Sequence, residues 1–130
     1  MKKFLILALA SLSLNALAFM PEVECESRID GKILFVEIEQ PFPSSSHFRQ
    51  AKTTLIVDGK ESIEEFSVTA RMPRGFKEVN YVGSGLNMTV NLWPDSIPRW
   101  GRTYRATIYS STALGNQRLN DIECRFPFAQ

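Results

Sequence analysis

The sequence predicts an all-β fold, a single antiparallel β-sandwich of about 7–8 strands, with a small closed β-barrel as the alternative. Apolar and polar residues alternate with a period of two in short runs, the pattern of half-buried strands. Turn-forming residues separate these runs at spacings of roughly 8–12 residues, and no long amphipathic helix is present. Alternation shows that one face of each strand is buried, but a sandwich and a barrel both satisfy that condition.

Two hairpins are predicted in the first half. Residues 23–29 alternate apolar with charged positions and run into Asp30-Gly31, a pair that tolerates the positive φ of a tight turn, before a second alternating run at 34–39. Asp58-Gly59 follows residues 53–57 in the same way and precedes a strand that reaches to about Met72. Helix is the competing interpretation for residues 61–66, and the β-branched run that follows favours strand.

The second half continues the pattern. Residues 86–92 alternate cleanly, and residues 103–109 and 120–126 place apolar side chains together on one face. Cys25 and Cys124 both fall on apolar faces, in the first and last strands.

The N-terminus has the three features of a secretory signal peptide. Lys2 and Lys3 precede an apolar stretch, and Ala16-Leu17-Ala18 provides a small-x-small cleavage site. These features predict a cleaved signal peptide at residues 1–18 and one disulfide-stapled β domain at residues 19–130, periplasmic or secreted. The apolar stretch is too short for a membrane-spanning helix, so no integral membrane segment is expected after cleavage. An outer-membrane barrel is disfavoured, because the faces opposite the apolar ones carry charged and amide side chains.

Cys25 and Cys124 are expected to form one disulfide. Exported domains occupy oxidising compartments, and each cysteine lies near one end of the mature chain. A metal site and a redox pair are the alternatives, and both lack the required spacing: there is no Cys-x-x-Cys, and His47 is the only histidine. No metal and no cofactor are expected.

Charge is unevenly distributed. Removing Lys2 and Lys3 from the 15 basic residues leaves 13 against 14 acidic residues, a net charge of −1 for the mature chain. Residues 19–70 hold 5 basic and 10 acidic residues, whereas residues 71–105 hold 6 basic and 2 acidic. The basic middle hints at an anionic partner. Nucleic acid is not expected, because the basic patch is small and the compartment is wrong.

Catalytic motifs are scarce. His47 stands in a loop beside Ser44, Ser45 and Ser46, an arrangement more typical of a solvated connection than of a catalytic triad. The acidic residues mostly occupy turns and solvated strand faces, so no pair stands out as a glycosidase pair.

Residues 93–102 least resemble scaffold, because two tryptophans, two prolines and two arginines occupy one connection. Rigid aromatics beside guanidinium groups are typical of surfaces that stack on a sugar or grip an anion. The alternative is that the indoles plug the end of the core while the arginines pair with acidic residues. The predicted binding residues are Trp93, Arg99, Trp100, Arg102 and, on the following strand, Arg105.

No motif identifies a family. The sequence therefore predicts a noncatalytic exported β domain that binds a protein, a glycan or an anionic surface, with the partner unknown. The alternative is a small envelope hydrolase that uses carboxylates or His47.

Overall fold

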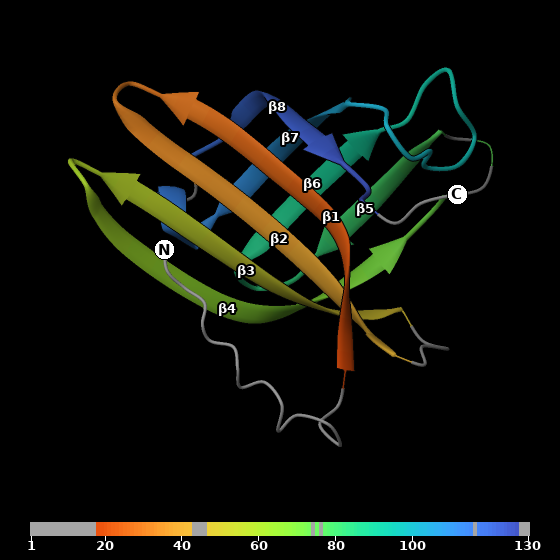
Figure 1. Cartoon of the computed structure of the whole chain (residues 1–130), viewed down its shortest axis with the longest axis horizontal. Helices are drawn as coiled ribbons and strands as arrows, with labels where there is room; N and C mark the ends of the chain where they lie inside the picture. Colours follow the sequence, from red (N-terminus) through yellow and green to blue (C-terminus); the bar gives the residue numbers. More distant parts are fainter. Residues whose placement is uncertain (1–17, 43–46, 74, 76, 116, 128–130) are drawn as a thin grey trace.

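Eight antiparallel strands form one sheet that closes on itself as a barrel (Figure 1). The computed structural model describes residues 18–42, 47–73, 75, 77–115 and 117–127. The predicted signal peptide lies outside the described residues except for Ala18. The strands are β1 (Ala18–Ile29), β2 (Lys32–Phe42), β3 (Phe48–Val57), β4 (Lys60–Arg71), β5 (Glu78–Val82), β6 (Leu86–Asn91), β7 (Tyr104–Ser111) and β8 (Leu119–Arg125).

Each strand pairs with its neighbours along the chain, and β1 also pairs with β8. The prediction of an antiparallel all-β fold is confirmed, and the closed barrel that was its alternative replaces the preferred sandwich. The reason is the pairing of the first strand with the last, which joins residues about a hundred positions apart. Local alternation carries no information on that pairing.

The two predicted hairpins are present, and both turns have the expected backbone. Asp30 and Gly31 have φ values of 46° and 81°, and Asp58 and Gly59 have φ values of 52° and 78°. Positive φ at both central positions matches the right-handed twist of the flanking strands. Residues 61–66 are strand, as the β-branched run indicated.

Every strand contributes side chains to one buried interior. The buried set includes Cys25, Val36, Ala51, Val68, Tyr81, Met88, Ile108 and Ile122, one from each strand. An eight-stranded barrel is just wide enough for its interior to be filled by side chains. The core therefore fills most of the barrel, and the space for a site lies at its ends.

The two ends of the barrel differ. At one end the 3₁₀ turn η2 (Thr112–Leu114) crosses between β7 and β8, and Leu114 packs against the core. The Thr112 hydroxyl donates a 2.5 Å hydrogen bond to Oε1 of Glu64 on β4, and the Thr112 amide donates to the carbonyl of Gly85. This end is sealed, whereas the opposite end carries the longer connections. None of the described residues belongs to a helix long and apolar enough to cross a membrane.

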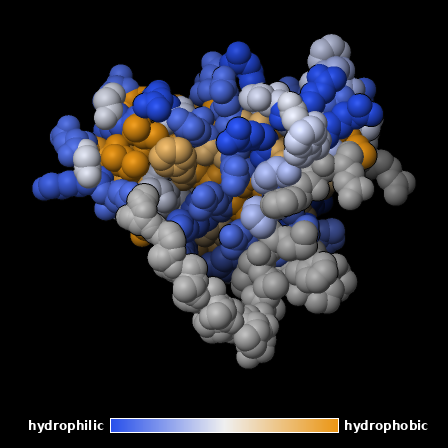
Figure 2. All heavy atoms as spheres, viewed as in Figure 1, coloured by the Kyte–Doolittle hydropathy of each residue, from blue (hydrophilic) through white to orange (hydrophobic). Residues whose placement is uncertain are grey.

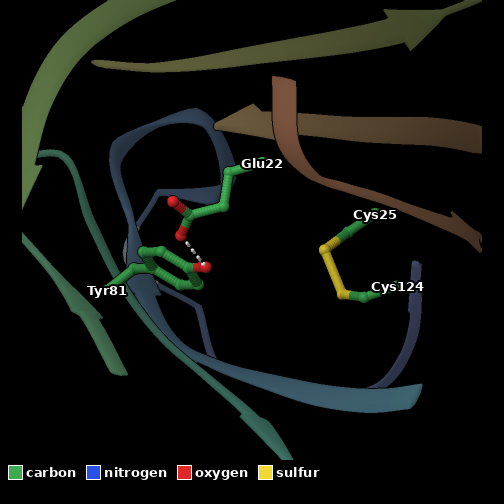
Figure 3. Close-up of a disulfide and its surroundings, with 4 residues drawn as sticks. All are labelled: Glu22, Cys25, Tyr81 and Cys124. Carbon is green, nitrogen blue, oxygen red and sulfur yellow. Dashed lines mark hydrogen bonds between the residues drawn. A yellow bond between two sulfur atoms is a disulfide. The ribbon is translucent and has the colours of Figure 1, made fainter. Parts of the chain in front are cut away.

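The disulfide joins Cys25 and Cys124, directly opposite one another on β1 and β8 (Figure 3). Three residue pairs, from Glu24 with Arg125 to Glu26 with Glu123, make up the ladder between these strands. The disulfide therefore lies in the seam that closes the barrel, inside its wall.

Candidate binding site at the open end of the barrel

A β-bulge in β1 brings a carboxylate into the barrel. Pro21 pairs with Glu39, but Val23 pairs with Ile38, so Glu22 is the extra residue on β1. A bulge places two consecutive residues on the same face of a strand. Glu22 therefore joins Val23 on the inner face, although strict alternation would turn it outward with Glu24.

Inside the barrel Glu22 is held by two partners from other strands. Nε of Arg49, on β3, lies 2.6 Å from Glu22 Oε1, and the Tyr81 hydroxyl, on β5, donates a 2.5 Å hydrogen bond to Oε2 (Figure 3). The Glu22 and Arg49 side chains are about 15% exposed, and Tyr81 is fully buried. Burial, followed by the negative charge of Glu22, raises the pKa of Tyr81 well above its usual range. Tyr81 therefore remains a hydrogen-bond donor at neutral pH.

This buried cluster lies at the floor of a cavity of about 400 Å³ that opens at the unsealed end. The walls are mainly apolar and come from four parts of the chain, with Ala70 and Met72 at the end of β4, Val79 on β5, Pro98 in the connection after β6 and Phe126 after β8. His47 and Arg71 also border the cavity. Its volume falls in the range of small ligand pockets, about 300–1,000 Å³, and a mainly apolar wall with a few polar groups is typical of a binding site.

The connection between β6 and β7 forms one rim of this cavity. We call residues 92–103 the rim loop. Its organising residue is Tyr104, whose hydroxyl donates a 2.7 Å hydrogen bond to Asp95 Oδ2 and accepts one from the Arg99 amide at 2.9 Å. Nε of Arg102 lies 3.3 Å from the same Asp95 oxygen. Burial, followed by the hydrogen bond to Asp95, raises the pKa of Tyr104.

The base of the rim loop is fixed in the same way. The Leu92 side chain is buried, and its amide donates to the carbonyl of Lys77 at 2.8 Å. The Trp93 amide donates to Oδ1 of Asn91 at 3.0 Å, and the peptide bond between Trp93 and Pro94 is cis. The base of the loop is thus held by the buried Leu92 side chain and by hydrogen bonds of backbone amides, without burial of the two indoles.

Except for Leu92, the large apolar side chains of the rim loop point into solvent. Trp93 is 70% exposed, Trp100 71% and Ile97 57%. The exposure of both indoles excludes the alternative in which they plug the end of the core. Pro98, next to Ile97, lines the cavity, so the exposed side chains belong to a loop that borders it.

The structure brings four of the five predicted binding residues onto the rim loop: Trp93, Arg99, Trp100 and Arg102. Arg99 is exposed, and no ion pair among the described residues includes it. Arg105 is placed elsewhere, on the outer wall of β7, where it pairs with Asp121 of β8 at 3.1 Å. Its side chain points outward, as the alternation along β7 requires, and away from the rim loop.

The cavity contains catalytic residue types without a catalytic arrangement. His47 and Glu22 both line it, but both Glu22 oxygens already accept hydrogen bonds, and the described lining holds no second carboxylate. The serines at 44–46 lie outside the described residues. Within the described part of the chain, no three His, Cys, Asp or Glu side chains are grouped to hold a metal ion.

Sequence reasoning missed Glu22, Arg49, Tyr81 and Asp95. Arg49 carried a usable signal, because it shares the alternating face of Ala51 and Thr53, both of which are buried. Glu22 carried no such signal, since its position depends on the bulge.

Comparison with known proteins found no matching family model, no matching curated protein and no matching solved structure.

Proposed function

We propose that this chain is exported to an oxidising compartment, the periplasm or the exterior, and there binds a protein partner noncatalytically through the rim loop. The observation that carries the proposal is the exposure of Trp93, Ile97 and Trp100 on one anchored loop. Exposed large apolar side chains on an ordered surface are uncommon unless they contact something. Tryptophan and arginine are also the residues most enriched among interface hot spots.

The order of the rim loop supports this proposal. A loop already held in one conformation loses less entropy on binding, so more of the contact energy appears as affinity. The hydrogen bonds of Tyr104 and the ion pair of Asp95 with Arg102 provide that order without using the indoles. Arg99 adds a positive charge beside them, which favours an acidic contact surface on the partner.

The cavity gives the partner a place to anchor. The rim loop borders it through Pro98 and its wall is mainly apolar, so a protruding apolar side chain of a partner bound to the rim loop would fit it. Anchors of this kind, buried in a pocket and surrounded by weaker contacts, carry most of the energy in protein interfaces.

The test is capture from an envelope extract with the oxidised mature protein, comparing wild type with Trp93→Ala/Trp100→Ala. Each indole is mostly exposed, so the variant is expected to lose less than about 0.5 kcal/mol of stability per site. Tyr109→Ala is the matched control, because Tyr109 is an exposed aromatic residue on β7 outside the rim loop.

We expect a protein retained by wild type and by Tyr109→Ala to be lost with the double tryptophan variant. Capture that is equal for all three proteins would refute the proposal. If capture survives protease treatment of the extract but is lost after glycosidase treatment, the partner is a glycan and not a protein.

A small hydrolase is the second candidate, and it rests on the presence of His47 and Glu22 in one cavity. The saturation of Glu22 by Arg49 and Tyr81 weighs against it. Purified wild type and His47→Ala should be compared on a panel of chromogenic ester and glycoside substrates. Turnover that is lost in His47→Ala would favour the hydrolase over the binding protein.

A further inference from the structure

One side of the β3–β4 hairpin has an open sheet edge. β4 pairs with β3 along its length, from Lys60 to Thr69, but with β5 only through Thr69, Ala70 and Arg71. No described strand pairs with residues 61–65 of β4 on the side away from β3. Figure 1 shows this hairpin extending past the shorter strands β5 and β6.

The turn between β5 and β6 marks where the edge begins. A Cβ on Gly85 would lie 2.9 Å from the Phe66 ring, so the turn packs tightly against β4 at this residue. All five residues from 61 to 65 are exposed. The open edge is therefore residues 61–65, at the sealed end of the barrel, far along the strands from the rim loop.

The register identifies the backbone groups that this edge presents. In a two-residue hairpin the residues flanking the turn, here Val57 and Lys60, exchange hydrogen bonds, and bonded and non-bonded pairs then alternate. Ser62 and Glu64 thus bond to β3. The amide and carbonyl groups of Glu61, Ile63 and Glu65 point to the open side.

The same three residues place their side chains on the outer face of the sheet. Ile63 is 51% exposed and lies opposite Thr54 in the register, beside the partly exposed Ile56 of β3. Figure 2 shows an apolar patch, surrounded by hydrophilic side chains, over the part of the sheet near the β1–β2 and β3–β4 turns. Glu61 and Glu65 flank Ile63, and no ion pair among the described residues includes either of them.

We propose that residues 61–65 form a strand-addition site for an extended segment of another protein with a basic–x–apolar–x–basic pattern. An added strand would pair with the amide and carbonyl groups of Glu61, Ile63 and Glu65, and its alternate side chains would lie beside theirs. Opposite charges on directly facing residues stabilise a strand pair, and apolar residues beside Ile63 extend the apolar surface.

A second copy of this chain fits the edge poorly. In an antiparallel pair centred on Ile63, Glu61 of one copy would face Glu65 of the other, and like charges directly opposite destabilise the pair. Acidic side chains along an exposed edge are a recognised protection against self-pairing. The charge pattern that discourages a second copy therefore selects a basic partner.

The test uses two capped peptides with the cores Lys-Thr-Val-Thr-Lys and Glu-Thr-Val-Thr-Glu, titrated into the ¹⁵N-labelled oxidised protein. We expect the lysine peptide to bind roughly tenfold more tightly. The amide signals of Glu61, Ile63 and Glu65 should shift most, while those of Ser62 and Glu64 shift less. Equal affinity for the two peptides, or shifts centred elsewhere, would overturn the proposal.

Charge reversal provides the decisive variant. Glu61→Lys/Glu65→Lys should reverse the preference in favour of the glutamate peptide. Glu26→Lys/Glu123→Lys, which makes the same charge change on the exposed outer faces of β1 and β8, should keep the preference of wild type. If the control variant also reverses the preference between the two peptides, the peptides respond to the net charge of the protein, and the proposal fails.

A backbone variant checks the pairing itself. Ile63→Pro removes an amide that points to the open side, so the ladder with β3 keeps its bonds while peptide binding should be lost. Sedimentation of the wild type should show a monomer. A dimer that Ile63→Pro abolishes would overturn the choice of partner in favour of a second copy.

Discussion

The hydroxyl of Tyr81 on β5 donates a 2.5 Å hydrogen bond to the carboxylate of Glu22 on β1, across the interior of the barrel. Arg49 of β3 holds the other carboxylate oxygen at 2.6 Å, so three strands that are not neighbours in the sheet meet at one charged group. The contact is possible because the bulge in β1 turns Glu22 inward. It orders the floor of the cavity below the rim loop.

Removing the charge of Glu22 alone from its pair with Arg49 should lower the stability of the fold. Glu22→Gln removes the carboxylate charge that lies against Arg49 in a mostly buried position, and we expect a loss of about 3 kcal/mol in the free energy of unfolding. The double variant Glu22→Gln/Arg49→Met should be more stable than Glu22→Gln, because the guanidinium charge is removed as well. Urea unfolding of wild type, Glu22→Gln, Arg49→Met and the double variant gives the coupling energy, and additive losses would contradict the buried pair.

Alkaline pH should destabilise the protein through Tyr81. The pKa of Tyr81 is raised above the value of about 10 that it has in the unfolded chain, so above pH 10 the unfolded state loses a proton that the folded state retains. The unfolded state then binds fewer protons, and stability falls as the pH rises. Tyr81→Phe should show a shallower fall between pH 9 and pH 11 in denaturant unfolding. An identical slope in both proteins would contradict the raised pKa.

Loss of the disulfide should cost a large part of the stability. Cys25 and Cys124 are 99 residues apart, and the chain-entropy model gives about 4.7 kcal/mol for closing a loop of about that length. Cys25→Ala/Cys124→Ala should therefore unfold at much lower urea concentration than wild type. Alkylation of the wild-type protein, isolated without reductant, should label no thiol, and two labelled thiols would show that the bond does not form.

Gly85 should tolerate a side chain only if Phe66 is made smaller. A Cβ at this position would lie 2.9 Å from the Phe66 ring, so Gly85→Ala forces the ring to move, and we expect a loss of about 1–3 kcal/mol. Phe66→Ala lowers stability by itself but removes the ring atoms Cγ, Cδ1 and Cε1 that this Cβ would meet. The combined variant should therefore lose less than the two separate losses added together, and strict additivity would indicate that the turn relaxes without touching the ring.

The order of the rim loop should depend on the Tyr104 hydroxyl. Tyr104→Phe removes the donor to Asp95 and the acceptor of the Arg99 amide, and we expect a loss of about 1–2 kcal/mol. Hydrogen exchange at the Arg99 amide should become faster, while amides in the strands change little. Tyr109→Phe is the control, and equal acceleration of exchange in both variants would contradict the role of Tyr104.

The β-strands and both Asp-Gly hairpins could be predicted from local signals, whereas the pairing of the two cysteines followed from their number and their positions near the two ends of the mature chain. Alternation reports which face of a strand is buried, and Asp58-Gly59 reports a turn that needs positive φ at both positions. The rim loop was also recognisable, because its composition departs from that of the strands around it. The signals for the strands, the turns and the rim loop are each contained within about ten neighbouring residues.

The closure of the sheet was decided only by tertiary structure, because the pairing of β1 with β8 joins the two ends of the chain. The position of Glu22 depended on the bulge, which appears only when β1 is aligned with β2. Arg105 followed its strand away from the rim loop for a similar reason, since the wall of the barrel supplies Asp121 beside it. The sequence by itself thus determined which segments form strands and turns. Long-range pairing determined which side chains share the open end, because register and closure depend on contacts between residues far apart in the chain.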